Sequence, residues 1–375
     1  MSNPRADVAV VGGGILGLAH AYHAAKAGRS VVLFERSPRA MGASIRNFGM
    51  VWPVGQPAGH MHQMAMKSRA TWLEVIAAAK LPHYPTGSLH VVYRDDEATV
   101  AQEFAALAPA QGFDVTWLTS RQVLDRSPAV VAEGLLGGLW SPTEVVVDPR
   151  VTLWNLPAYL AEQLGVTLRY NTAVTRIDLP RITAGAETWE VDQVYVCGGD
   201  DFQTLYPEVF GASGITRCKL QMLRTAPQPD QWQLGPSLAA GLTLRFYSSF
   251  GLCPSLPQLK ARIAAETPEF DQWGIHVLVS QTAAGEITLG DTHEYGLAVD
   301  IFDKPHLDTL VLNYLATFAR FPDTTITQRW HGVYAKHPEL PYCVFDPAPG
   351  VRIVTAPGGS GMTLSFGLAA HTSTL

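Results

Sequence analysis

The chain has 375 residues, of which 47% are hydrophobic and 16% are charged, and its formal net charge is −6 at pH 7. This composition is typical of a globular protein with enough residues for two domains, and it excludes an intrinsically disordered chain. The acidic balance, without a run of lysines and arginines, gives no electrostatic basis for binding nucleic acid or an anionic membrane.

The most informative segment lies near the start, at Gly12-Gly13-Gly14-Ile15-Leu16-Gly17. It follows an apolar run at 8–11, which predicts a strand, and it opens a small-residue stretch at 15–27, which predicts a helix. A second predicted strand, 30–34, ends at Glu35. The pattern G-x-G-x-x-G between strand and helix, with an acid after the next strand, is the fingerprint of a dinucleotide-binding turn. The sequence therefore predicts an adenine dinucleotide, either NAD or FAD.

Each residue of this motif has an expected role. Gly12 permits the tight turn, Gly14 lets the pyrophosphate approach the backbone, and Gly17 lets the helix lie close to the sheet. The helix start offers N–H groups and the positive end of its dipole to the phosphates. We expect the Glu35 carboxylate to accept hydrogen bonds from the ribose hydroxyls.

The next part of the chain alternates between helices and strands. Residues 36–50 form a small and polar loop that can line a cofactor, and a helix is predicted at 60–79, before Pro82 and Pro85. Residues 88–93 alternate like a strand, 95–111 are typical of a helix, and 115–118 of a strand. The segment 134–140 is glycine-rich and apolar, and the apolar run at 145–149 ends at a predicted turn.

From residue 149 the chain returns to an α/β pattern. A helix is predicted at 157–164, strands at 166–170 and 173–177, and a buried strand at 193–196 that enters a turn at Cys197-Gly198-Gly199. Alternating segments between 216 and 330, among them 242–247 and 274–279, predict an antiparallel sheet with one face over a ligand. A last strand at 351–356 enters a glycine turn at 358–361, and a final helix follows.

These elements predict an α/β fold, α+β over the whole chain, with a Rossmann-like nucleotide-binding domain interrupted by an antiparallel-sheet substrate-binding domain. The nucleotide-binding domain is expected to comprise residues 1–85, 150–215 and 330–375, and the substrate-binding domain 86–149 and 216–329. The first strand begins by Asp7, which leaves no room for a signal peptide. The four cysteines form no C-x-x-C pair, which favours reduced thiols and a cytoplasmic location.

The three glycine motifs in this order, together with the Gly42-Ala43-Ser44 loop, resemble those of the D-amino-acid oxidase-like FAD oxidoreductases. Glycine oxidase, sarcosine oxidase and D-amino-acid dehydrogenase belong to that family, and the resemblance covers essentially the whole chain. It implies FAD rather than NAD. It also implies non-covalent FAD, because the segment 328–338 has no cysteine where some sarcosine oxidases attach the flavin.

The resemblance implies which residues bind the cofactor. In the family the last glycine turn opens a helix aimed at the flavin pyrimidine edge, where N–H groups stabilise the charge of the reduced ring. Thr363 matches the position of a lysine that helps reduced flavin react with oxygen, so both O2 and another electron acceptor stay open. The expected cofactor-binding residues are Gly12, Gly14, Ile15, Leu16, Gly17, Glu35, Arg36, Ser44, Asn47, Gly49, Met50, Val174, Cys197, Gly198, Gly199, Gly359, Ser360, Gly361, Met362 and Thr363.

Within the family, residues 43–50 resemble a branch found alongside phosphonate-degradation genes. The resemblance implies oxidation of an N-methylated or hydroxylated aminoethylphosphonate to phosphonoacetaldehyde or a similar product. Hydride transfer to flavin N5 would give an imine, which water hydrolyses to an aldehyde or keto product and an amine or ammonia. Hydrogen peroxide forms if O2 is the acceptor.

A small anionic amine needs a cationic anchor, and arginine suits both carboxylate and phosphonate. Arg46 is the first candidate for catalysis and substrate binding, with a phosphate-binding or surface arginine as the alternative. Lys336 and His337 are catalytic candidates because either could replace the missing lysine charge. Further candidates for substrate binding are Met50 and, on predicted alternating strands, Arg245, Tyr247 and His276; weaker ones are Lys219, Gln221 and Arg224.

The sequence is also compatible with other functions. A sarcosine-, glycine- or D-amino-acid-type oxidase or dehydrogenase would bind a carboxylate through one arginine. A non-catalytic subunit that carries FAD for a partner is a second alternative, and an NAD-dependent dehydrogenase a third. The histidines and acids show no metal-ligand spacing such as H-x-x-x-H, so no metal site is expected. The oligomeric state stays open.

Overall fold

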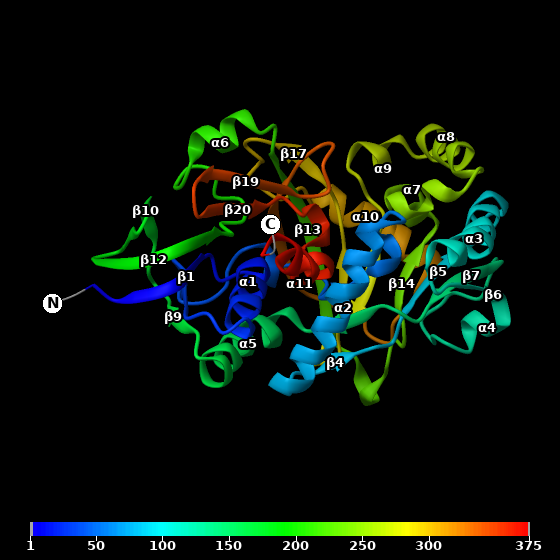
Figure 1. Cartoon of the computed structure of the whole chain (residues 1–375). Coiled ribbons are helices and arrows are strands. Elements are labelled where there is room, and N and C mark those ends of the chain that lie inside the picture. The colour runs from blue at the N-terminus through cyan, green and yellow to red at the C-terminus, as the bar shows by residue number, and fades with distance from the viewer. Residues whose placement is uncertain (1–2, 374–375) are drawn as a thin grey trace.

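The computed structural model describes residues 3–373 and builds them around two large sheets (Figure 1). The first sheet has the order β10-β11-β12-β1-β2-β9, with β20 paired to β12 and β19 to β20. Strand β1 is parallel to β2 and to β12, and β12 is parallel to β20. Its strands are β1 (Arg5–Val11), β2 (Val31–Phe34), β9 (Thr167–Arg169), β10 (Val174–Asp178), β11 (Arg181–Ala184), β12 (Glu187–Val196), β19 (Cys343–Ala348) and β20 (Val351–Thr355).

Helices from distant parts of the chain pack on this sheet and share one core. Trp72 is fully buried there, stacks edge-on against Phe366 with ring centroids 5.0 Å apart, and donates its indole N–H to the Met362 carbonyl at 2.7 Å. This packing ties the last helix to the first half of the chain. The helices are α1 (Ile15–Lys26), α2 (His60–Ala79), α5 (Pro149–Leu164) and α11 (Gly361–Thr372), with α6 (Pro207–Ala212) elsewhere in the same region.

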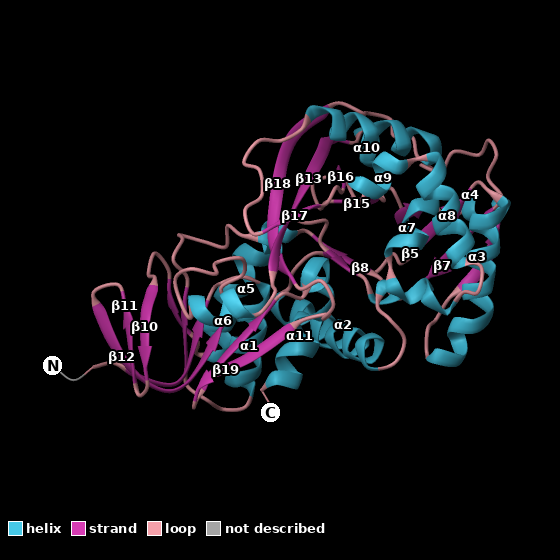
Figure 2. Cartoon of the chain, turned by 90° about the horizontal axis from the view of Figure 1, so that it is seen from above, coloured by secondary structure: helices cyan, strands magenta, loops and turns pink. Residues whose placement is uncertain are grey.

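The second sheet has the order β17-β13-β16-β15-β14-β5-β7-β6, and β18 pairs with β13. Most of its pairs are antiparallel, and β5 is parallel to β14. Figure 2 shows the long strands β13 and β18 between the two sheet regions. The strands are β5 (Ser88–Val92), β6 (Thr116–Thr119), β7 (Gly137–Ser141), β13 (Thr216–Pro227), β14 (Ser237–Ala240), β15 (Leu278–Gln281), β16 (Glu286–Gly290), β17 (Glu294–Gly296) and β18 (Ile326–Lys336).

Six helices accompany the second sheet, and a small third sheet has the strand order β3-β8-β4. No helix within residues 3–373 is both long and apolar enough to cross a membrane. The remaining α-helices and β-strands are α3 (Asp95–Leu107), α4 (Ser120–Leu124), α7 (Gly241–Phe246), α8 (Leu256–Glu266), α9 (Pro268–Gln272), α10 (Pro305–Phe318), β3 (Met50–Val51), β4 (His83–Tyr84) and β8 (Val145–Val147).

The predicted fold class is confirmed, and the predictions for the segments 157–164 and 242–247 are wrong. The helix predicted at 157–164 begins at Pro149, because Asp148 caps it by accepting the Arg150 N–H at 2.9 Å, so no turn follows β8. Pro157 lies inside this helix rather than at its start. The segment 242–247 is mostly the helix α7, not a strand. The expected domain boundary at 330 falls within β18, which pairs with β13 along its whole length.

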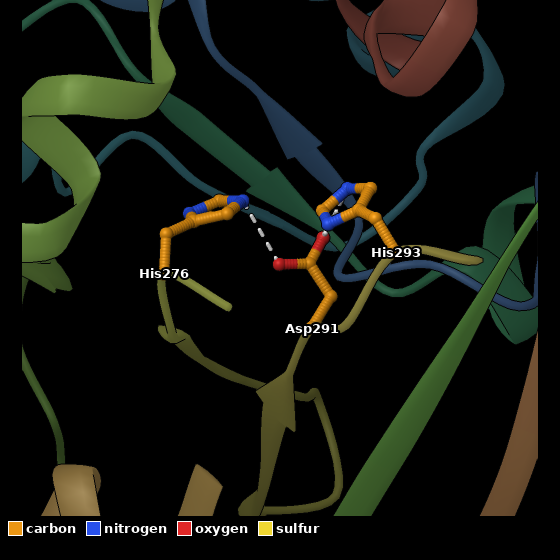
Figure 3. A group of neighbouring side chains, drawn as sticks. All are labelled: His276, Asp291 and His293. Carbon is orange, nitrogen blue, oxygen red and sulfur yellow. Dashed lines mark ion pairs between the residues drawn. The ribbon is translucent and has the colours of Figure 1, made fainter. Parts of the chain in front are cut away.

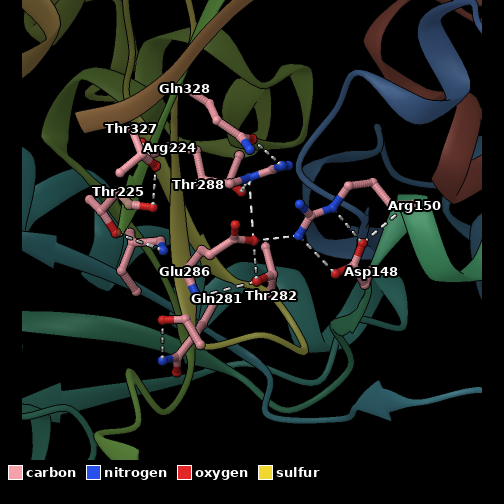
Figure 4. A network of polar contacts seen from close by, with 12 residues as sticks. Asp148, Arg150, Arg224, Thr225, Gln281, Thr282, Glu286, Thr288, Thr327 and Gln328 are labelled. Atoms are coloured by element: carbon pink, nitrogen blue, oxygen red, sulfur yellow. Dashed lines mark hydrogen bonds and ion pairs between the residues drawn. The ribbon is translucent and has the colours of Figure 1, made fainter. Parts of the chain in front are cut away.

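A buried polar network joins the start of α5 to the second sheet (Figure 4). Arg150 forms ion pairs with Asp148, at 3.3 Å, and with Glu286 of β16. Glu286 lies 3.9 Å from the guanidinium of Arg224, which donates to the Gln328 side chain at 2.9 Å. Because each charge has an opposite partner, the network holds the two sheet regions together without an isolated buried ion.

Candidate active site

One cavity of about 810 Å³ extends between the two sheet regions. It is lined by the turns that follow β1, β2 and β12, by the start of α11, and by side chains of the second sheet. The ends of parallel strands in a doubly wound sheet are the usual place for a nucleotide. The cavity therefore has a nucleotide end on the first sheet and a substrate end on the second.

The turn between β1 and α1 has the geometry of a dinucleotide-binding turn. Gly12 has a φ of +106°, and an ideal Cβ there would lie 2.3 Å from the Cys197 carbonyl oxygen. Gly14 lines the cavity, and as the residue before α1 it has no side-chain cap. Gly17 does not line the cavity, because its Cα packs against Gly12, and a Cβ would lie 1.8 Å from the Gly12 carbonyl oxygen. Its role is to let helix and strand touch.

Glu35 lines the cavity and also shapes the turn before it. One carboxylate oxygen accepts the Gly13 N–H at 2.7 Å, and the other accepts the Ser37 N–H at 2.8 Å. A carboxylate has about four lone-pair sites, so these two bonds leave acceptors for a ribose. The neighbouring Arg36 lines the cavity and pairs with Asp201 at 2.7 Å.

The loop at 42–50 connects the nucleotide turn with the substrate end. Ser44 accepts the Ile15 N–H at 3.0 Å and so caps α1 from 29 positions away. Asn47 donates to two carbonyls of the loop and accepts the Gly49 N–H at 2.7 Å. Gly49 itself does not line the cavity: its φ is +74°, and a Cβ would lie 1.8 Å from the Val147 carbonyl oxygen. Gly49 allows the chain to turn close to Val147, whereas Ser44 and Asn47 line the cavity.

The start of α11 closes the nucleotide end. Ser360 accepts a hydrogen bond from the Gln56 amide at 3.0 Å, and Thr363 accepts the Trp52 N–H at 2.9 Å. The residue before the helix offers no side-chain cap to the first helical N–H groups, which a ligand can bind. The cavity is also lined by the other predicted cofactor residues, namely Ile15, Leu16, Met50, Val174, Cys197, Gly198, Gly199, Gly359, Gly361 and Met362.

Burial defines the chemistry of Cys197. Its side chain is 6% exposed, and burial raises the pKa of its thiol. The sulfur lies 3.7 Å from His20 Nδ1, a buried histidine whose own pKa burial lowers to about 4. A protonated thiol beside a neutral imidazole packs the turn and is no nucleophile.

The substrate end has apolar and aromatic walls. Strand β13 turns alternate residues into it: Leu220 and Met222 line the cavity, whereas Lys219 pairs with Asp303 at 3.0 Å on the other face. Gln221 likewise binds Asp308, and Arg224 belongs to the network with Glu286, so none of the three weaker candidates lines the cavity. Other walls are Trp52, Phe246, Tyr247, Leu278 and Tyr334.

The three residues predicted to be catalytic, Arg46, Lys336 and His337, all line the cavity. Arg46 is half-buried and donates one N–H to the His331 carbonyl at 3.1 Å. The Lys336 ammonium lies 3.3 Å from the Tyr295 hydroxyl, and His337 accepts the N–H groups of two following residues through Nδ1. Arg46 and Lys336 are thus the predicted cations that a ligand in the cavity can reach.

Arg245 was predicted to bind the substrate from a strand, and the structure places it elsewhere. It lies in α7, forms an ion pair with Asp271 at 2.8 Å, donates to the Leu242 and Ile275 carbonyls, and does not line the cavity. The alternating pattern was misleading because α7 spans six residues, of which Leu242, Thr243 and Leu244 are all buried. Periodicity cannot distinguish so short and so fully buried a helix from a strand. Tyr247 and His276 line the cavity, but from the segments after α7 and before β15.

The sequence analysis named His276 as a candidate for substrate binding but missed the two buried side chains beside it, Asp291 and His293. His276, Asp291 and His293 line the cavity, and their ligand atoms lie within 4.8 Å of one another (Figure 3). They are 1%, 7% and 3% exposed. His276 Nε2 is 2.9 Å from one Asp291 oxygen, and His293 Nε2 is 3.7 Å from the other. Burial lowers the pKa of His293 to about 4. Only the D-x-H spacing of the last two residues is visible in the sequence.

The cavity suits FAD. It offers a turn with no side chains at Gly12 and Gly14, two helix starts, and a carboxylate at the end of β2. These are the groups that bind a pyrophosphate and a ribose. The remaining length of the cavity leaves space beyond a nucleotide for a small substrate.

Comparisons with known proteins agree with this geometry. The family model described as "FAD dependent oxidoreductase" matches residues 7–375. A glycine oxidase from Geobacillus kaustophilus is 28% identical over 165 residues, 42% of this chain and 43% of that protein. A glycerol 3-phosphate dehydrogenase from Caloramator mitchellensis is 23% identical over 327 residues, 84% of this chain and 60% of that protein. The chain thus spans about half the length of the curated relatives it matches.

The fold has a close counterpart among solved structures. The crystal structure of glycine oxidase from Geobacillus kaustophilus superposes with a TM-score of 0.76 at 19% identity. The match covers 98% of this chain and 94% of that one.

Proposed function

The chain belongs to the family of FAD-dependent oxidoreductases, and on this premise we propose that it oxidises the C–N bond of a small anionic amine. The observation that carries the proposal is the continuous cavity of about 810 Å³, in which the nucleotide-binding turns and the substrate-end walls share one space. The relative named as a glycine oxidase supports an amine as the substrate.

The protein's part in such a reaction is binding and orientation. FAD, when bound, supplies the acceptor for a hydride from the carbon next to the nitrogen. The substrate loses two electrons and becomes an imine, which water hydrolyses to a carbonyl compound and an amine or ammonia. Trp52, Tyr247 and Tyr334 surround the substrate with apolar surface, which excludes water and favours the neutral amine.

The anionic group of the substrate needs a cation, and Arg46 is the side chain we assign to it. Arg46 donates one N–H to the His331 carbonyl, and within residues 3–373 its other guanidinium donors have no partner. Lys336 supplies a second positive charge on the cavity wall. Two cations suit a dianion better than a monoanion.

Within this function we infer that the substrate is an N-substituted aminoethylphosphonate. Two observations support it: the resemblance of residues 43–50 to the phosphonate-associated branch, and the two cations on the cavity wall. An amine that carries a carboxylate, such as glycine or sarcosine, is the second candidate, and the glycine oxidase relative favours it. We leave the electron acceptor as O2 or another oxidant.

Anaerobic bleaching of the yellow holoenzyme tests the proposal. N-methyl-aminoethylphosphonate and sarcosine are added in parallel at equal concentration, with glycerol 3-phosphate as an anionic alcohol control because one relative is named for it. Faster bleaching by the phosphonate supports an aminoethylphosphonate as the substrate. Bleaching by sarcosine alone shows instead that the substrate is an amine that carries a carboxylate. Bleaching by neither amine overturns amine oxidation and favours a subunit that carries FAD for a partner. Admission of air then tests O2 as acceptor.

A further inference from the structure

We propose that His276, Asp291 and His293 form a binding site for one divalent transition-metal ion at the substrate end of the cavity. Imidazole and carboxylate ligands suit several such ions, and Zn2+ is the representative one. The site itself is independent of the proposed function.

Strand pairing brings the three residues together. Strands β15 and β16 are antiparallel, with Leu278 opposite Gly290, so the chain before β15 meets the chain after β16. His276 lies two positions before Leu278, and Asp291 directly follows Gly290. The three residues thus lie on adjacent ends of two hydrogen-bonded strands, a rigid base for ligands.

The orientation of His293 points to a cation. Its Nδ1 lies 2.8 Å from the Gly274 carbonyl, which can only accept, so Nδ1 carries the hydrogen. A histidine that ligates a metal commonly donates its other ring N–H in this way. The lone pair of Nε2 then faces an oxygen of Asp291 at 3.7 Å, as Figure 3 shows. Two acceptors that face each other repel unless a positive charge lies between them.

The distances favour an ion over a proton as that charge. A hydrogen bond from a protonated His293 to Asp291 would need a separation of about 2.7–3.2 Å. Ligand atoms about 2.1 Å from a common ion lie roughly 3 to 3.5 Å apart. The contacts of 2.9 Å from His276 and 3.7 Å from His293 to the two Asp291 oxygens bracket that range, and an ion bound by all three residues would draw together ligand atoms that now lie within 4.8 Å of one another.

His276 supplies a second, independent observation. It is 1% exposed, and within residues 3–373 neither of its ring nitrogens has a hydrogen-bond partner, although Nε2 lies 2.9 Å from an Asp291 oxygen. The Asp291 oxygen at that contact is also unsatisfied. Each buried unpaired polar atom costs about 1–3 kcal/mol, and a shared ion would satisfy two of these atoms, His276 Nε2 and the Asp291 oxygen that faces it.

The ion would have an open ligand position toward the cavity, because all three residues line it. Three protein ligands and one open position are the arrangement of zinc sites that bind a substrate. The anionic group of the amine is the ligand we expect there, beside the charges of Arg46 and Lys336. This role, unlike the site, rests on the proposed function.

Metal content of the holoenzyme tests the site. The FAD-bound protein is stripped with a chelator, loaded with Zn2+, desalted and analysed for zinc relative to bound FAD. We expect about one zinc per FAD in the wild type and less than about a tenth of that in Asp291→Asn and His293→Gln. His62→Gln, a change at a buried histidine outside the cavity, should keep the wild-type ratio.

Because the zinc content is expressed relative to bound FAD, unfolded protein does not contribute to the ratio. If Asp291→Asn or His293→Gln does not retain FAD, His276→Gln is measured in its place. A wild type that retains no zinc, or variants that retain as much as the wild type, overturns the site. The role is tested separately: zinc should lower the KM for the amine by about tenfold relative to the stripped enzyme. An unchanged KM overturns the role. Absence of amine oxidation with and without zinc is a failure of the proposed function, and the zinc content still decides the site.

Discussion

Two glycines of the first turn should respond differently to the same added methyl group. At Gly17 an ideal Cβ would lie 1.8 Å from the Gly12 carbonyl oxygen and 3.3 Å from Val10 Cγ1. Contact between heavy atoms begins at roughly 3.5 Å, so α1 and β1 would have to separate by more than about 1 Å. We therefore expect Gly17→Ala to lower the free energy of unfolding of the FAD-free protein by about 3 kcal/mol.

At Gly14 the backbone tolerates a side chain. Its φ of −74° and ψ of 176° are open to any residue, and an ideal Cβ would meet only Ser44, 3.0 Å from its hydroxyl oxygen. The free energy of unfolding of FAD-free Gly14→Ala should therefore stay within about 1 kcal/mol of the wild type. The methyl stands where the pyrophosphate approaches the backbone, so FAD affinity should fall at least tenfold, about 1.4 kcal/mol.

Urea unfolding of the FAD-free proteins and titration with FAD, followed by flavin fluorescence, separate the two effects. The expected pattern is a stable but weakly binding Gly14→Ala and an unstable Gly17→Ala. Wild-type FAD affinity in Gly14→Ala would show that the pyrophosphate does not approach this turn. A Gly17→Ala protein as stable as the wild type would refute the argument from helix–strand contact.

Three further changes test the loop, the network and the anchor. Ser44→Ala removes the acceptor of the Ile15 N–H and should lower the free energy of unfolding by about 1 kcal/mol, measured with urea; no change would mean that water caps the helix equally well. Arg150→Ala leaves two carboxylates of a partly buried network without their shared partner, and thermal and urea unfolding should show a loss of about 3 kcal/mol. Arg46→Ala should raise the KM or slow flavin reduction about tenfold or more in stopped-flow bleaching. Arg245→Ala, outside the cavity, is its matched control and should leave both values unchanged.

The nucleotide end of the cavity could be predicted because its signals are local. A strand, a turn that needs glycine and a helix follow one another within 22 residues, from Arg5 to Lys26, and the sequence shows all three. The helix at 60–79 agrees with its prediction at both ends. Even there, the sequence could not distinguish glycines that face the ligand from those that serve packing, as Gly17 and Gly49 do.

The substrate end could not be predicted in the same way, because its residues meet only through tertiary structure. His276 is separated from Asp291 by a hairpin, and the sequence shows only the D-x-H spacing of Asp291 and His293, which does not point to His276. In the same region the first four residues of the short helix α7, 241–244, are all buried, so no alternation of polar and apolar residues reveals its helical period. For that reason Arg245 was predicted to face the substrate, whereas its guanidinium forms an ion pair with Asp271.

The loop at 42–50 explains how one chain can join the two ends of the cavity. Ser44 caps α1 beside the nucleotide turn. Two positions later the Arg46 side chain donates to the His331 carbonyl, and the Arg46 backbone carbonyl accepts the Trp330 indole N–H at 3.1 Å, both partners being on β18. A ligand that orders the start of α1 therefore also fixes the backbone that carries Arg46. Binding of the cofactor and placement of the anion anchor are thus coupled through a few hydrogen bonds, and the anchor should reach its full affinity only in the FAD-bound protein.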